Sequence, residues 1–144
     1  MANRNTYPGV EMENVNSGRI ANAVSGAVTT SWIVPVHQMD NIDIEITTTG
    51  TLTSAFTILM SSSYRQSQGV NSTPTVIQAG TFTDITANAL TKYPNVTHYG
   101  TDPAAGTSTQ RYCIFQCPAQ FIKITNTYTS GAGNVTIYVN AKGF

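Results

Sequence analysis

Charged side chains are scarce in this chain of 144 residues. Asp, Glu, Lys and Arg make up 10% of the sequence, against about 25% in an average soluble domain. The seven basic residues balance the seven acidic ones, so the net charge is zero. A nucleic-acid-binding surface needs clustered Lys and Arg to displace counterions from phosphates. We therefore expect no direct contact with nucleic acid, and a neutral surface suits a protein that is assembled with many copies of a partner.

Long apolar runs are missing as well. No stretch approaches the roughly 18 consecutive apolar residues of a membrane span. The first ten residues, MANRNTYPGV, lack the apolar core of a secretory signal. We expect a protein that is made and kept in a cytosol, with no membrane contact. Its length predicts one compact domain that buries about 68–70% of its unfolded surface.

Cysteine is limited to Cys113 and Cys117. In a strand these two residues would share a face roughly 13 Å apart, which is too far for a disulfide. We expect both to be reduced, packed thiols. A metal pair would need at least two further ligands, and neither His37 nor His98 has a spacing that nominates it. No metal and no cofactor is predicted.

Hydroxyl and amide side chains take the place of the missing charges. Thr, Asn and Ser are abundant, and Thr favours strands more than Lys or Glu do. The last 24 residues, Phe121–Phe144, contain two alternating apolar and polar runs around a Gly-bearing turn. The apolar positions that share a face are Ile122, Ile124 and Tyr128 in the first run, and Val135, Ile137 and Val139 in the second. Because side chains alternate across a strand, this pattern predicts a C-terminal β-hairpin.

Alternation predicts further strands upstream. The runs Ile42–Ile46 and Leu52–Met60 flank a Thr-Gly turn and predict a second hairpin. The run Val28–Val36 predicts a strand in which Trp32 is a core anchor. Pro35 removes a ladder donor, so it indicates a sheet edge or a strand end.

The remaining segments complete an all-β pattern. Thr75–Ile85 predicts one or two strands, with a short helix near Asp84–Leu90, and Arg111–Gln116 predicts another strand. Thr91–Gln110 has no sustained periodicity and is expected to be a long loop over one end of the domain. With about seven or eight strands and frequent turn signals, the sequence predicts an antiparallel β-sandwich, and a jelly roll is the arrangement we expect.

Residues 1–18 are polar and aperiodic, and they predict an extended N-terminal arm before a single β-sandwich domain at residues 19–144. The arm could be held by a neighbouring protein or could fold back onto its own domain. An arm that is held must bury or pair side chains to offset the entropy it loses. We therefore predict Arg4, Tyr7 and Val10 as partner contacts.

Catalytic chemistry has little support. Asp40, Asp43 and Glu45 are the clustered carboxylates, and two of them alternate with isoleucines, which predicts that they face solvent. A glycosidase needs two carboxylates about 5–10 Å apart in a cleft, and the sequence nominates no such partner. No serine lies in a nucleophile elbow, and neither histidine has an evident carboxylate to orient it. We expect no enzyme and no catalytic residues.

Aromatic side chains lie in or beside the predicted loops. Tyr64, Tyr93 and Tyr99, with their neighbours Arg65 and His98, occupy positions where aromatic rings can stack on sugars or anchor a protein interface. Ordinary loop packing explains the same residues. Both interpretations stay open on the sequence alone.

Two blocks of the chain resemble a known class of proteins. The closing segment FIKITNTYTSGAGNVTIYVNAKG, preceded by Arg111-Tyr112, resembles the C-terminus of small virion proteins of tailed bacteriophages. The earlier block IDIEITTTGTLTSAFTILMSSS is similar to a second recurrent block of the same proteins. Together the two blocks cover roughly a third of the chain, and the order of the blocks and the terminal Ala141-Lys142-Gly143 add to the resemblance.

This resemblance implies a structural role in a phage particle. Similar proteins are β-sandwich or jelly-roll proteins that serve as capsid decoration or cement proteins, as head fibres and as parts of tails, without catalytic residues. The expectation is a decoration protein on the head surface of a virion assembled in the host cytoplasm. It would bind the major capsid protein or other virion proteins in many copies, and its copies would contact one another. The alternative is a carbohydrate-binding adhesin module of a head fibre or tail, with a glycan as partner.

Overall fold

The computed structural model describes residues 11–13, 17–36, 39–67, 75–86, 96–117 and 119–142. Over these ranges the chain forms twelve β-strands and no helix. The strands are β1 (Glu11–Glu13), β2 (Ser17–Ser25), β3 (Thr30–Pro35), β4 (Asn41–Thr48), β5 (Thr53–Ser61), β6 (Arg65–Gln66), β7 (Val76–Gln78), β8 (Thr83–Asp84), β9 (Val96–Tyr99), β10 (Ser108–Ile114), β11 (Phe121–Ser130) and β12 (Asn134–Lys142). The all-β class expected from the sequence is confirmed.

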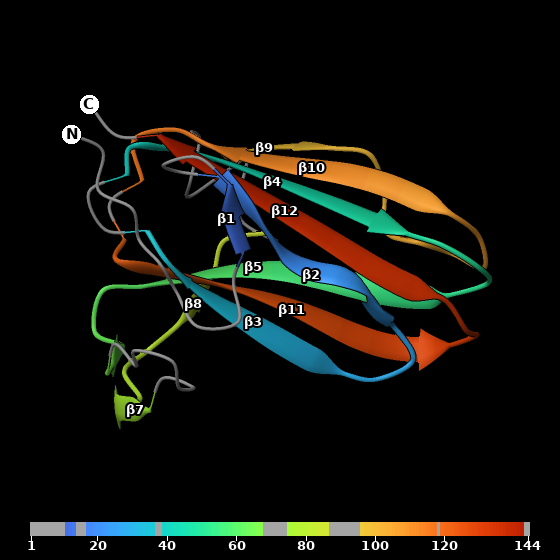
Figure 1. Ribbon diagram of the computed structural model, residues 1–144, viewed down its shortest axis with the longest axis horizontal. Helices are drawn as coiled ribbons and strands as arrows, with labels where there is room; N and C mark the ends of the chain where they lie inside the picture. Colours follow the sequence, from blue (N-terminus) through green and yellow to red (C-terminus); the bar gives the residue numbers. More distant parts are fainter. Residues whose placement is uncertain are drawn as a thin grey trace.

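The strands form two antiparallel sheets that pack face to face (Figure 1). One sheet has the order β1-β2-β12-β4-β10-β9, the other has the order β3-β11-β5-β8, and β6 pairs separately with β7. Eight of the strands can be numbered from one to eight in chain order, namely β2, β3, β4, β5, β8, β10, β11 and β12. In this numbering the two sheets have the strand orders 1-8-3-6 and 2-7-4-5. This is the strand order of a jelly roll. The predicted β-sandwich is therefore confirmed.

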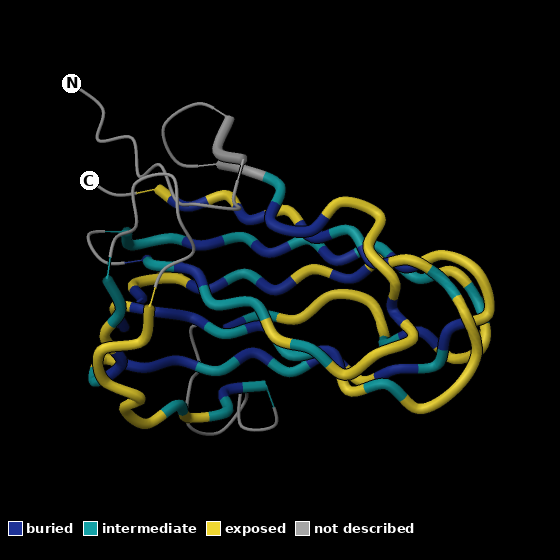
Figure 2. Tube along the Cα trace, turned by 60° about the horizontal axis from the view of Figure 1, so that its bottom comes forward, coloured by how far each residue is buried: buried dark blue, intermediate teal, exposed yellow. Residues whose placement is uncertain are grey.

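The core lies between the two sheets and follows from the alternation of the strands. Ile42, Ile44 and Ile46 of β4 are fully buried, while the carboxylates between them point outward. Aliphatic side chains from β5, β11 and β12 meet them from the same interior. Figure 2 shows buried segments running through the strands and exposed residues gathered in loops at the ends. Each buried aliphatic side chain stabilises the fold by about 1.5–3 kcal/mol.

Both predicted hairpins are wrong in their pairing. β11 pairs with β3 and β5, whereas β12 pairs with β2 and β4 in the opposite sheet. The strands β4 and β5 are likewise in different sheets. Here β4 and β5, and likewise β11 and β12, lie in opposite sheets and face the same core from opposite sides. Their alternation looks the same as that of two strands paired side by side.

The two turns that make these crossings hydrogen-bond to each other. The amide of Thr51 donates to the carbonyl of Ala132 at 2.8 Å, and the amide of Thr49 donates to the carbonyl of Asn134 at 3.0 Å. Gly131 and Gly133 allow this approach, because a Cβ on either would collide with a backbone carbonyl of the facing turn. Gly131 also has a φ of 83°, which favours glycine. The glycines thus serve the stacking of the two turns.

Four strands, β1, β2, β6 and β9, lie where the sequence predicts none. In β2, Ala23 has a φ of 48° and the register with β12 shifts, so the alternation of the strand is broken. The strand β9 falls inside the predicted loop Thr91–Gln110 and has only four residues, too few to show a period. The loop prediction is wrong for residues 96–99 and 108–110. In the helix predicted near 84–90, residues 84–86 are not helical, and residues 87–90 lie outside the described ranges.

The predictions for Pro35 and Trp32 agree with the structure. Pro35 ends β3, which is an edge strand, and Trp32 is partly buried against the core, as predicted. Of the predicted arm, residues 1–10 and 14–16 lie outside the described residues, and with them the proposed contacts Arg4, Tyr7 and Val10. Within the arm's range, β1 pairs antiparallel with β2 and extends the larger sheet.

Candidate functional site

The outer face of the six-stranded sheet carries a row of large polar side chains. Cross-strand register places Tyr99 of β9 opposite Arg111 of β10, Arg111 opposite Glu45 of β4, and Glu45 opposite Tyr138 of β12. Arg111, Glu45 and Tyr138 lie on the outward side because their neighbours along each strand are buried, and Tyr99 shares that side through its register with Arg111. We call these four residues the outer row. It is made of two tyrosines with an ion pair between them.

Two members of the outer row, Arg111 and Glu45, form a three-residue ionic cluster with Asp43. The Nε of Arg111 lies 3.1 Å from Asp43 Oδ1, and its Nη2 lies 2.5 Å from Glu45 Oε2. Asp43 and Glu45 are two residues apart on β4, so both carboxylates project on the same side of the strand. All three side chains are between a third and a half exposed. The ion pairs are therefore screened by water and contribute little to stability, but their polar atoms are open to a ligand.

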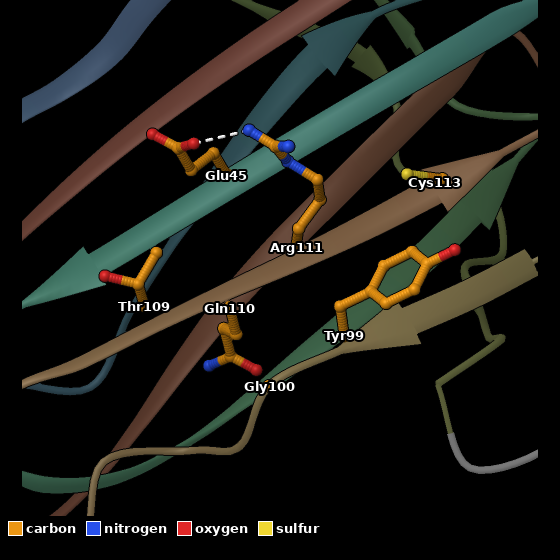
Figure 3. Close-up of a pocket in the computed structure, with 7 residues that line it drawn as sticks. All are labelled: Glu45, Tyr99, Gly100, Thr109, Gln110, Arg111 and Cys113. Atoms are coloured by element: carbon orange, nitrogen blue, oxygen red, sulfur yellow. Dashed lines mark hydrogen bonds and ion pairs between the residues drawn. The ribbon is translucent and has the colours of Figure 1, made fainter.

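A shallow depression lies beside this cluster, with a volume of about 470 Å³. Its lining residues are Glu45, Tyr99, Gly100, Thr109, Gln110, Arg111 and Cys113. Figure 3 shows Glu45 and Arg111 facing each other, with the ring of Tyr99 to one side. The volume falls within the range of about 300–1,000 Å³ that is typical of small-molecule sites.

Both cysteines are free thiols, as predicted from their spacing. Cys113 is half-buried on the outer face, where its Sγ donates to Asp43 Oδ1 at 3.6 Å. Burial raises the pKa of the Cys113 thiol, and the charge of Asp43 and this hydrogen bond raise it further. Cys117 lies buried beyond the end of β10, and burial raises its pKa too. The two thiols do not share a face, because β10 ends at Ile114.

A hydrogen-bond chain centred on Gln110 joins residues beside the depression. Gln110 is buried, and its Nε2 donates to Asp102 Oδ1 at 2.9 Å, while its Oε1 lies 2.8 Å from His98 Nε2. Asp102 Oδ1 also accepts from the amide of Phe56 at 3.1 Å, which ties the loop before β10 to the other sheet. The ring of His98 stacks on Tyr112 with centroids 4.1 Å apart. Burial raises the pKa of Tyr112, and the charge of Asp102 adds to the effect.

The structure separates the other predicted recognition residues. Tyr64 is only 4% exposed and packs against the rings of Phe82 and Phe121, so it has no free face for a sugar. Arg65 is exposed, and its Nη1 donates to the carbonyls of Ser62 and Tyr64. His98 is exposed, and its ring contacts Gln110 and stacks on Tyr112. Tyr93 lies outside the described residues, and Tyr99 is the one predicted residue that the outer row contains.

No known protein family, curated protein or solved structure matches the chain. The resemblance of two sequence blocks to phage virion proteins gains no support from these comparisons.

Within the described ranges the structure contains neither a metal-binding cluster nor a helix that could span a membrane. No group of three or more His, Cys, Asp or Glu side chains there could hold a metal ion. Those residues also contain no helix that is long and apolar enough to cross a membrane.

Sequence reasoning missed most of the outer row. Glu45 was expected only to face solvent, and Arg111 and Tyr138 were placed in strands without a role. One signal was available for Tyr138, because it is the aromatic member of an outward face that otherwise carries Thr136 and Asn140. The pairing of β9, β10, β4 and β12 was not available, because these strands are distant in sequence and β9 was unpredicted.

Proposed function

We propose that this protein is a non-enzymatic structural component of a tailed-phage virion, a capsid decoration or cement protein that binds the major capsid protein in many copies. The two resembling blocks carry this proposal. They contain β4, β5, β11 and β12, the central strands of the two sheets, together with the two turns that hydrogen-bond to each other. The resemblance therefore coincides with one connected scaffold. Its place would be the head surface of particles assembled in the host cytoplasm, with copies in mutual contact.

The geometry of the clustered carboxylates favours a non-enzymatic role. Asp43 and Glu45 both lie within ion-pair distance of the guanidinium of Arg111. A glycosidase needs one of its two groups as a carboxylic acid that can donate a proton. Asp40, the third of the clustered carboxylates, lies in the bend before β4 and has no ion pair with Arg111 among the described contacts.

An exposed apolar pair on β7 supports a protein contact. Val76 is 54% exposed and Ile77 is 71% exposed, and the pair lies on the small β6–β7 unit at one end of the sandwich (Figure 1). Consecutive strand residues point to opposite faces, so each of the two exposes apolar surface that a protein partner can bury. One such contact is weak, but a symmetric shell repeats it and converts modest affinity into avidity.

Co-sedimentation with empty capsids of the phage that encodes the chain tests the proposal. We expect the protein to pellet with the capsids, and we expect the double variant Val76→Ser and Ile77→Ser to bind at least tenfold more weakly. The reason is the lost burial of two aliphatic side chains, each worth about 1.5–3 kcal/mol when fully buried. A variant lacking residues 1–10 tests the predicted arm contacts in the same assay.

Val28→Ser is the matched control, because Val28 is a valine of similar exposure, 51%, away from β7. It should bind capsids as the wild type does. Failure of the wild-type protein to pellet with capsids would refute the proposal, whatever the variants do.

The alternative function, a carbohydrate-binding adhesin module of a head fibre or tail, was predicted from the loop tyrosines. Tyr64 is buried and Tyr93 lies outside the described residues, so within the described ranges Tyr99 is the exposed member of the three.

A further inference from the structure

Two exposed tyrosines stand on the same sheet face with the ionic cluster between them. Tyr99 is 59% exposed and Tyr138 is 43% exposed. They lie three strands apart in the outer row, with Arg111 and Glu45 at the two positions between them. Adjacent strands are about 4.8 Å apart, so the two tyrosine positions are separated by about 14 Å. One hexose ring is too short to reach both.

The polar atoms between the tyrosines match the hydroxyl groups of a sugar. Carboxylate oxygens of Asp43 and Glu45 accept hydrogen bonds, and a guanidinium has five N–H donors. Within the described residues Arg111 pairs with these two carboxylates, and the two contacts use two of its donors. Thr109 adds a hydroxyl at the margin of the depression. A site of this kind offers both donors and acceptors to a ligand rich in hydroxyl groups.

The aromatic rings of the two tyrosines match the apolar C–H faces of a sugar. A pyranose ring has one or two faces formed by C–H groups, and such a face stacks on an exposed aromatic side chain. Tyrosine supplies a large rigid contact area at little cost in conformational entropy. A ligand that carries both hydroxyl rims and C–H faces would use the tyrosines and the ionic cluster together.

The net charge of the ionic cluster favours neutral sugars over anionic ones. Asp43, Glu45 and Arg111 sum to one negative charge at the centre of the outer row. An anionic sugar would meet two carboxylates at the centre of the site. A neutral sugar meets no such repulsion.

We propose that the outer row is a binding site for a neutral, linear oligosaccharide that lies across the strands from Tyr99 to Tyr138. Its end rings stack on the two tyrosines, and its central hydroxyl groups exchange hydrogen bonds with Arg111, Glu45 and Asp43. This site is independent of the proposed capsid contact, because β7 belongs to a separate strand pair and not to this sheet.

The probes are linear hexose trisaccharides of α- and β-linked glucose, mannose and galactose, with uronic-acid and sulfated trisaccharides as anionic counterparts. They are arrayed first, and the best neutral binder is then titrated calorimetrically. We expect a neutral trisaccharide to bind. We expect Tyr99→Thr and Tyr138→Thr each to weaken its affinity roughly tenfold, as the loss of an exposed aromatic anchor does. Threonine is chosen because it keeps strand propensity on a face that already carries it.

Two controls separate ring stacking from damage to the fold. Tyr99→Phe retains the ring and should keep nearly wild-type affinity, whereas Ile77→Ala lies outside the sheet and should leave affinity unchanged. The two tyrosine variants should also still pellet with capsids. This last result distinguishes failure of the sugar site from failure of the proposed virion role.

Several results would overturn the inference. One is an array in which no neutral trisaccharide binds above background. Others are a preference for the uronic-acid or sulfated probes, or a double variant Tyr99→Thr, Tyr138→Thr that binds sugar as well as the wild type. A dimer in sedimentation equilibrium that this double variant dissociates would assign the face to a second copy of the chain instead.

Discussion

Apolar and charged side chains alternate along a single strand, β4. In β4 the isoleucines fill the core, and Asp43 and Glu45 between them meet Arg111 on the outer face. The same carboxylate that pairs with Arg111 also accepts a hydrogen bond from the thiol of Cys113. Asp43 therefore links the chemistry of the thiol to that of the ionic cluster.

The pKa of Cys113 tests this link. Burial, the charge of Asp43 and the hydrogen bond to Asp43 raise that pKa, and Arg111 lowers it. Asp43→Asn removes the negative charge and leaves Arg111 in place, so the thiolate becomes easier to form. We expect the pH midpoint of Cys113 alkylation by iodoacetamide to move to lower pH. Peptide mapping by mass spectrometry follows each cysteine separately.

Asp40→Asn is the matched control. The charge of Asp40 raises the pKa of Cys117, not that of Cys113. Its replacement should therefore leave the alkylation profile of Cys113 unchanged. An unchanged Cys113 midpoint in Asp43→Asn would show that Asp43 does not hold the thiol as described.

At the scale of the elements, alternation identifies strands but not their partners. It located β4, β5, β11 and β12 because each has a regular buried face. It then paired the neighbours in sequence, which the crossing connections of a jelly roll contradict. Strands that are bulged, as β2 is, or very short, as β9 is, carry too weak a period to be found.

The stacked turns should be a sensitive point of the fold. Gly131→Ala and Gly133→Ala each place a Cβ against a backbone carbonyl of the facing turn, and Gly131 also needs a positive φ. We expect each substitution to lower the free energy of unfolding by about 2 kcal/mol, the order of cost for a strained backbone position. Urea denaturation with a constant m-value is the measurement.

Gly106→Ala provides the comparison within the same protein. A Cβ at Gly106 meets no neighbouring atom within 4 Å. Its free energy of unfolding should stay the same or rise slightly, because alanine restricts the unfolded chain. Equal stability of the Gly131 and Gly106 variants would contradict the role assigned to the stacked turns.

At the scale of the whole molecule, charged residues are scarce, and the two candidate binding surfaces differ in character. The sandwich offers an outer sheet face with mixed polar and aromatic character, and at one end a small apolar unit at β7. The first suits a neutral ligand and the second suits a protein partner. One molecule can use both at once, since they lie on different strand sets.

The candidate site was only partly accessible from the sequence. Tyr99 was predicted from its loop-like surroundings, although it lies in a strand. Tyr64 was predicted on the same grounds and proved to be buried, because proximity to a loop does not reveal which rings pack below it. The outer row depends on the register among four strands, which only the assembled sheets provide.

The central claim is that this jelly roll is a structural protein bound to a phage head. The most direct test is a cryo-electron microscopy map of the intact particle at side-chain resolution. We predict copies of the sandwich at symmetry-related positions on the head surface, with Val76 and Ile77 against the major capsid protein. A map that shows no copy of the sandwich on the head would contradict the claim.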